Sequence, residues 1–178
     1  SSWVGTDKYE KTYDTNSNIL LQTNYTWDTM TGFWVGTNKY EYTYDANNNQ
    51  ALRVDYTWDT MTSSWVGTNK SENTYDANNN ILFYTNYTWD TMTSSWVETT
   101  KYDYTYDANN NQTSLTYYTW DTMTSSWVGS YKQEYTYDAN NNQILYINYT
   151  WDTITGSWFG NYKQESTYDA NNNILLTT

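Results

Sequence analysis

The sequence predicts an all-β protein made of tandem β-hairpins that join into one long antiparallel meander sheet. Three observations predict this fold: a 31-residue repeat without insertions, an alternation of aromatic and polar residues within each copy, and turn signals between the alternating runs. Tyr, Trp, Thr and Val suit strands, and no helical period competes with the alternation. We expect the sheet to coil, or to assemble through its aromatic face.

The repeat is regular along the whole chain. Two tryptophan series advance in steps of 31 residues: Trp3, Trp34, Trp65, Trp96, Trp127 and Trp158, and Trp27, Trp58, Trp89, Trp120 and Trp151. Residues 1–178 therefore form a single array, with copies starting at positions 1, 32, 63, 94, 125 and 156. Terminal repeats of a complete array are usually atypical, and these are not, so we expect a fragment of a longer array.

Each copy contains two expected strands. In the second copy, aromatic and small residues alternate with Lys, Glu and Thr from Trp34 to Tyr44, and apolar residues alternate with polar ones from Leu52 to Trp58. Because side chains of a strand alternate between the two surfaces of its sheet, one face is expected to be aromatic. The opposite face is expected to carry charges and hydroxyl groups.

The phrase TYDANNN at residues 43–49, which recurs in later copies, predicts the first turn. Asp starts a type I turn well, and Asn is the best non-Gly residue at positive φ. An odd-length loop of this kind pairs Tyr44 with Gln50 and Tyr42 with Leu52. The expected turn-forming residues are Asp14, Asp45, Asn48, Asp76, Asn79, Asp107, Asn110, Asp138, Asn141, Asp169 and Asn172.

The phrase DTMTSS predicts the second turn, a four-residue loop from Thr60 to Ser63. It ends where other copies have Gly32 and Gly156, a natural site for a left-handed backbone. Both turns together place all aromatic residues on one face and pair Trp27 with Trp34, with a glycine such as Gly36 beside the rings. Glu98 breaks the glycine pattern. The expected self-assembly or ligand face consists of Trp27, Trp34, Tyr42, Tyr44, Tyr56, Trp58, Trp65, Trp89, Trp96, Trp120, Trp127, Trp151 and Trp158.

A parallel β-solenoid with one 31-residue coil per copy is the alternative fold. It would stack equivalent residues at roughly 4.8 Å, so that six Lys in one column and six acids in the next would each face a like charge. A meander separates equivalent residues by two strands, about 9.6 Å, and is therefore favoured.

The residues Tyr42, Tyr44, Asp45, Ala46, Asn47 and Asn49 carry a resemblance that extends to every copy. The sequence resembles YD repeats of the RHS type and is closer still to YDANGN…WD…W repeats of secreted Bacteroidetes-type surface proteins. This resemblance implies β-hairpins joined into a long coiling sheet that is displayed outside the cell or used as a shell. Asn48 stands where the family has glycine, and the 31-residue period is longer than that of typical RHS repeats. No toxin or autoprotease core is present in the sequence, so a toxin-shell role does not carry over.

Composition restricts the function. A net charge of -12 makes nucleic acid an unsuitable partner, and the absence of Cys and His removes thiol chemistry and the commonest base and metal ligand. No apolar run is long enough to insert into a membrane. We expect no enzymatic activity, no cofactor and no bound metal, in a protein located outside the cell or at the cell surface.

The favoured hypothesis is a structural segment of an extracellular filament, stalk or adhesin that forms a homo-oligomer or fibre through its aromatic face. A carbohydrate-binding surface module is the main alternative, with cell-surface glycans as partners of the Trp and Tyr rings. Ice binding by the threonine rows that contain Thr43 and Thr57 is a further alternative. Calcium binding by the oxygens of the DANNN turn is disfavoured, because the EF-hand glycine is missing.

Overall fold

The computed structural model describes residues 6–178, which form twelve β-strands. The strands are β1 (Asp7–Tyr13), β2 (Ile19–Asp28), β3 (Phe33–Tyr44), β4 (Gln50–Asp59), β5 (Ser64–Tyr75), β6 (Ile81–Asp90), β7 (Ser95–Tyr106), β8 (Gln112–Asp121), β9 (Ser126–Tyr137), β10 (Gln143–Asp152), β11 (Ser157–Tyr168) and β12 (Ile174–Thr177). No helix among the described residues is long and apolar enough to cross a membrane.

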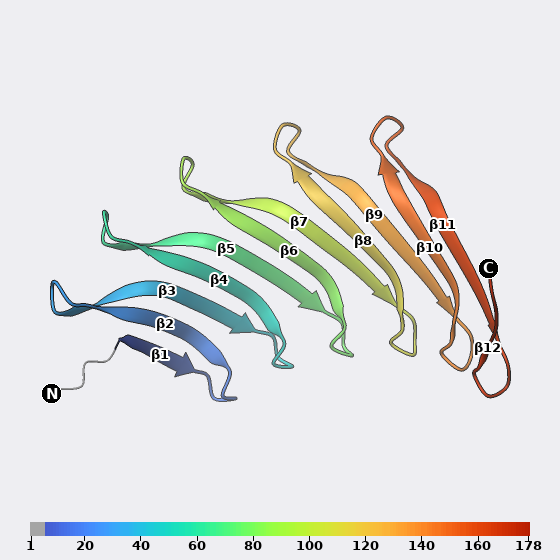
Figure 1. The fold of residues 1–178 in the computed structure, drawn as a ribbon, viewed down its shortest axis with the longest axis horizontal. Coiled ribbons are helices and arrows are strands. Elements are labelled where there is room, and N and C mark those ends of the chain that lie inside the picture. The colour runs from blue at the N-terminus through green and yellow to red at the C-terminus, as the bar shows by residue number, and fades with distance from the viewer. Residues whose placement is uncertain (1–5) are drawn as a thin grey trace. The chain divides into compact units, whose positions relative to one another are not determined.

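The strand order follows the sequence from β1 to β12 (Figure 1). Consecutive strands pair in antiparallel fashion, as in β2 with β3 and β3 with β4. The predicted all-β meander is therefore confirmed, and the parallel solenoid is wrong. The solenoid fails because equivalent residues of successive copies are separated by an intervening antiparallel strand.

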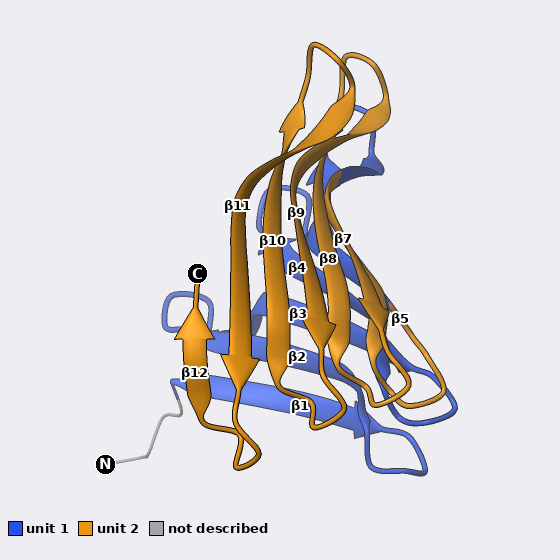
Figure 2. Cartoon of the chain, turned by 90° about the vertical axis from the view of Figure 1, so that its right-hand side faces the viewer, with its two compact units in different colours: residues 1–73, 86–98 blue, residues 74–85, 99–178 orange. Residues whose placement is uncertain are grey.

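The chain divides into two compact units (Figure 2). One unit comprises residues 1–73 and 86–98, and the other comprises residues 74–85 and 99–178. Each unit consists of strands and turns from several copies of the repeat. The contacts described below lie within one unit or the other.

Neither unit contains a conventional hydrophobic core. Among the described residues, Val54 is the one buried apolar side chain, at 6% exposure, and no large side chain is fully buried. Thr23 and Thr116, which occupy the same repeat position as Val54 in other copies, are also buried. Most side chains of the sheet are half-exposed, so the fold must be stabilised mainly by contacts between neighbouring side chains along the sheet.

The DANNN turns have the predicted geometry. In the second copy, Asn48 N–H donates to the Asp45 carbonyl at 3.1 Å, which closes a type I turn, and Asn48 then adopts a φ of 66°. The Asp45 carboxylate accepts hydrogen bonds from the backbone N–H groups of Asn47 and Asn49 and from the Asn49 side chain. The side-chain bond from Asn49 is the main reason why the pKa of Asp45 is lowered.

The DTMTSS turns also agree with the prediction, because the loop spans Thr60–Ser63 between β4 and β5. Ser63 has a φ of 51°, and Gly32 and Gly156 have φ values of 73° and 64° at the equivalent positions. The Asp59 carboxylate accepts hydrogen bonds from Met61 N–H and from the Thr62 hydroxyl group. In both kinds of turn, the residue with a positive φ therefore stands at the position that the sequence predicted.

The register between the turns differs from the prediction. Tyr44 pairs with Gln50 as expected, but Tyr42 pairs with Arg53 and not with Leu52, because Ala51 is an unpaired extra residue in a β-bulge. A second bulge places Thr68 without a partner between the pairs Asp55–Asn69 and Tyr56–Gly67. Equivalent bulges interrupt the other described hairpins.

The two bulges overturn the prediction of a single aromatic face. Each extra residue shifts the alternation by one position, so the residues that follow it point to the opposite surface. In β3, the bulge at Thr37 leaves Trp34 and Gly36 on one face with Lys39 and Glu41, and places Tyr40 and Tyr42 on the other. The Thr37 hydroxyl group donates to the Asn24 carbonyl at 3.1 Å and thereby fixes the bulge.

Candidate functional site

The sheet presents two chemically different faces. The tryptophan face carries the Trp pairs, the Lys–Glu pairs and tyrosines equivalent to Tyr56. The tyrosine face carries Tyr40, Tyr42, Tyr44 and their equivalents, together with Arg53 and Asp55. Of the predicted site residues, Tyr42 and Tyr44 therefore lie on the face opposite to Tyr56 and the tryptophans.

The predicted tryptophan pairs are confirmed. The rings of Trp58 and Trp65 meet edge to face with centroids 5.1 Å apart. The other four pairs have the same arrangement at 5.0–5.3 Å: Trp27 with Trp34, Trp89 with Trp96, Trp120 with Trp127, and Trp151 with Trp158.

Three of the tryptophan pairs also pack on a glycine of the preceding copy, namely Gly36, Gly67 or Gly129. A Cβ atom added to Gly36 would lie 2.7 Å from the Trp65 ring, and one added to Gly67 would lie 2.8 Å from the Trp96 ring. The sequence predicted glycines beside these rings. It did not predict that the ring belongs to the next copy, so that the glycine is a site of contact between copies.

Charged residues on the tryptophan face form a repeated network. Lys39 Nζ lies 2.7 Å from a Glu41 carboxylate oxygen and 4.0 Å from the centre of the Tyr56 ring, and the Tyr56 hydroxyl group donates to Glu41 at 2.8 Å. Burial alone would raise the pKa of Glu41, but the bonds from Lys39 and Tyr56 outweigh it and lower that pKa. Burial and the Glu41 carboxylate raise the pKa of Tyr56 to about 12.

The copy that starts at residue 94 departs from this network. Asp103 replaces the glutamate, forms its ion pair with Lys101 at 3.3 Å, and leaves its Oδ1 atom buried without a hydrogen bond. Glu98 occupies the glycine position in the same copy.

The tyrosine face carries rows of rings that cross several strands. In the unit that contains residues 99–178, ring centroids follow one another from Tyr84 to Tyr102, Tyr117 and Tyr131 at distances of 5.9, 4.7 and 5.1 Å. In the other unit, the guanidinium group of Arg53 binds the Asp55 carboxylate through two nitrogen atoms.

The row of DANNN turns along one margin of the sheet contains contacts that the sequence reasoning missed. Asn48 Oδ1 accepts hydrogen bonds from the side chains of Asn16 and Asn18 in the preceding turn, at 2.8 and 2.9 Å. The same bond joins Asn80 to Asn110, Asn111 to Asn141, and Asn142 to Asn172. The asparagine at position 48, where the YD repeats that the sequence resembles have glycine, was the sequence signal for these bonds.

The two threonine rows considered for ice binding lie on opposite faces. Thr43 pairs with Leu52 on the tryptophan face, whereas Thr57 pairs with Asn38 on the tyrosine face. The rows therefore do not form one hydroxyl array. Among residues 6–178, no group of three or more acidic side chains is arranged to hold a metal ion.

A groove lies on the tryptophan side, between the ends of two successive hairpins. Near the DTMTSS turns, Trp58 and Asp59 pair only with β5 among the described strands, so each hairpin end is a two-stranded arm. The groove between two such arms has a volume of about 650 Å³. Its lining consists of Tyr56, Asp59, Thr62, Ser64, Trp65, Val66, Gly67, Trp89, Thr91, Ser94 and Trp96.

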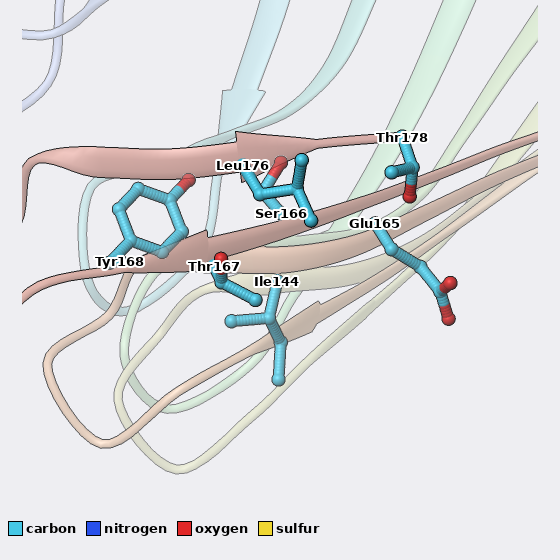
Figure 3. A pocket seen from close by; sticks show the side chains of 7 residues that line it. All are labelled: Ile144, Glu165, Ser166, Thr167, Tyr168, Leu176 and Thr178. Atoms are coloured by element: carbon cyan, nitrogen blue, oxygen red, sulfur yellow. The ribbon is translucent and has the colours of Figure 1, made fainter.

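A second hollow, of about 540 Å³, lies beside β11 and β12 (Figure 3). Its lining residues are Ile144, Glu165, Ser166, Thr167, Tyr168, Leu176 and Thr178. Successive β11 residues in this lining point to opposite faces of the sheet, so their side chains do not converge on one ligand position.

No known family model matches the sequence, and no curated protein is significantly similar to it. Several solved structures are similar in fold. A DUF3836 family protein from Bacteroides vulgatus has 17% identity and a TM-score of 0.43, over 53% of this chain and 91% of that chain. A protein of unknown function from Bacteroides fragilis has 18% identity and a TM-score of 0.33, over 88% and 89% of the two chains.

The Tc holotoxin pore of Photorhabdus luminescens contains a segment similar to this chain. The identity is 14% and the TM-score 0.49, over 91% of this chain and 9% of the toxin chain. All three TM-scores lie below 0.5. The assignment of this chain as a tandem β-hairpin repeat protein therefore rests on its own repeat and strand pairing.

Proposed function

We propose that this chain is a structural repeat segment of an extracellular filament, stalk or adhesin, and that it self-assembles through its Trp-rich and Tyr-rich sheet faces. The observation that carries the proposal is that the repeated side chains are used to bind the neighbouring copy. No catalytic activity is part of this proposal.

Two kinds of contact between copies, and one within a copy, support a structural role. Trp65 packs against Gly36, Asn18 donates to Asn48, and the equivalents of both recur at later copies in the sequence. The bond from Tyr56 to Glu41 joins the two strands of one hairpin, and the same bond joins Tyr87 to Glu72. Interactions that recur from copy to copy suit an array whose length can change without loss of fold.

The half-exposed faces support assembly. Large apolar side chains remain exposed on the strands, among them Phe83 at 47%, and monomeric proteins rarely expose contiguous apolar patches of more than a few hundred Å². A net charge of -12 and the absence of cysteine agree with a location outside the cell, where acidic repeat arrays stay soluble until they assemble.

Sedimentation velocity and negative-stain imaging across a concentration series would test the proposal. The expected result is concentration-dependent growth into oligomers or fibres. Phe83→Glu, which places a charge on the tryptophan face, should reduce this growth. Met61→Glu is the matched control, because Met61 is 92% exposed at a turn tip and lies outside both faces. Compact monomers at every concentration would contradict self-assembly.

A further inference from the structure

The groove between two hairpin arms combines aromatic walls with a hydroxyl-rich rim. Trp65, Trp89, Trp96 and Tyr56 contribute half-exposed rings, and Thr62, Ser64, Thr91 and Ser94 contribute hydroxyl groups. All of these residues belong to the unit that comprises residues 1–73 and 86–98.

The groove is preorganised. Trp89 and Trp96 meet edge to face at 5.1 Å, and Trp96 lies over Gly67 in the floor of the groove. On the rim, the Thr62 hydroxyl group lies 2.7 Å from the Asp59 carboxylate and 2.8 Å from the Ser64 hydroxyl group. Fixed rings and fixed hydroxyl groups reduce the conformational entropy that a ligand must remove on binding.

The chemistry of this lining fits a neutral polyol. Aromatic rings can cover the apolar face of a pyranose ring, while hydroxyl and carboxylate oxygens accept or donate to its hydroxyl groups. The lining contains Asp59 and no Lys or Arg, and the chain as a whole carries a net charge of -12, so an anionic ligand would be repelled.

The spacing of the repeat favours a long ligand over a single sugar. In the paired part of the sheet, equivalent positions of successive copies lie two strands apart, about 9.6 Å. The lining residues Asp59, Thr62, Ser64 and Trp65 recur in sequence as Asp90, Thr93, Ser95 and Trp96. An extended polymer of β-linked pyranoses presents the same ring face at every second sugar, which is a comparable distance.

We propose that the groove between the tryptophan arms binds an extended, uncharged β-linked polysaccharide. The sugar rings stack on Trp65 and Trp89, and the hydroxyl groups of Thr62 and Ser64 bind the ring substituents. This binding requires one chain only, whereas self-assembly requires two, although both use residues of the tryptophan face.

The test is titration calorimetry of the intact chain with cellohexaose and chitohexaose, with the α-linked isomaltohexaose as the contrasting ligand. A β-linked hexasaccharide should bind and the α-linked one should not. Trp89→Phe should weaken binding several-fold and Trp89→Ala should abolish it. Gln22→Ala, at a position that pairs with Tyr40 on the opposite face, should leave it unchanged. Circular dichroism checks folding, and ligand protection of tryptophan from oxidation in the unsubstituted chain provides a measurement that needs no variant.

Absence of heat and of protection with both β-linked ligands at millimolar concentration would overturn the proposal. Binding that survives Trp89→Ala in a folded chain would overturn the assignment to this groove. Self-association that Trp89→Ala abolishes, without any glycan binding, would mean that a second chain occupies the groove. The glycan proposal can therefore fail while the structural function stands, and the reverse also holds.

Discussion

At the scale of single residues, the closest packing occurs where a tryptophan lies on a glycine of the preceding copy. Gly36 has an ordinary backbone conformation, so its importance lies in the space that it leaves for the Trp65 ring. Packing therefore requires glycine at position 36, whereas the positive φ favours glycine at positions 32 and 156.

We predict that Gly36→Ala destabilises the protein by about 1–3 kcal/mol, because the new methyl group would lie 2.7 Å from Trp65 and displace its ring. Urea unfolding measures this cost. Glu98 at the equivalent position of another copy indicates that the fold itself should survive. Gly160→Ala is the matched control, because its nearest neighbour would be the Tyr149 ring at an ordinary 3.6 Å. Equal effects of the two substitutions would contradict the packing argument.

Asp103 provides a second prediction at this scale. Its side chain is one methylene shorter than that of Glu41, and its buried Oδ1 atom has no hydrogen-bond partner. We expect Asp103→Glu to stabilise the chain by about 0.5–1.5 kcal/mol, because the longer side chain can reach Tyr118 as Glu41 reaches Tyr56. Glu41→Asp should have the opposite effect in the same unfolding measurement. A neutral or destabilising Asp103→Glu would show that the pocket around residue 103 has adapted to aspartate.

At the scale of elements, the turns could be predicted from the sequence and the faces could not. Asp45 and Asn48 are residue types with strong local preferences, so both turns and the pairing of Tyr44 with Gln50 followed from local chemistry. The bulge residues Ala51 and Thr37 have no such signature. One extra residue reverses the direction of every side chain beyond it. Because the prediction lacked the two bulge residues, it assigned Tyr42 and Tyr44 to the wrong face.

The candidate site was predictable to a similar extent. Pairing of Trp58 with Trp65 follows from the turn between them, which is local. The seating of Trp65 on Gly36 joins residues of different hairpins, and the groove depends on the separation of two hairpin arms. These features depend on how one hairpin packs on the next, which a periodic sequence does not specify by itself.

We predict that Asn48→Gly destabilises the chain by about 1 kcal/mol, although glycine is the residue best suited to a positive φ. The substitution removes the Oδ1 atom that accepts hydrogen bonds from Asn16 and Asn18. Ser17→Gly is the matched control, because Ser17 has a φ of 69° and its hydroxyl group forms no hydrogen bond with the described residues. Thermal unfolding compares the two variants. A stabilising Asn48→Gly would mean that the bonds between turns contribute nothing measurable.

At the scale of the whole molecule, stability is distributed over many similar contacts, since the described residues contain no fully buried large side chain. Tyrosines take part in a large share of these contacts on both faces. Burial is the main cause of a raised pKa at Tyr42, Tyr56, Tyr104, Tyr118 and Tyr135, while at Tyr149 the hydrogen bond to Glu134 is the main cause. The protonated form of these tyrosines is thus favoured by folding.

Alkaline pH should therefore unfold the chain cooperatively. A tyrosine with a raised pKa binds its proton more tightly in the folded state, so its contribution to stability is complete below the unfolded value of about 10 and is lost as the pH rises toward the folded value. For Tyr56 the folded value is about 12. We expect the free energy of unfolding to stay level to about pH 9 and to fall steeply between about pH 10 and 12. Tyrosinate absorbance and circular dichroism should change together over this range, and Tyr56→Phe should lessen the slope. Tyrosines that ionise near pH 10 while the sheet signal remains intact would contradict this account, because folding would then not raise their pKa.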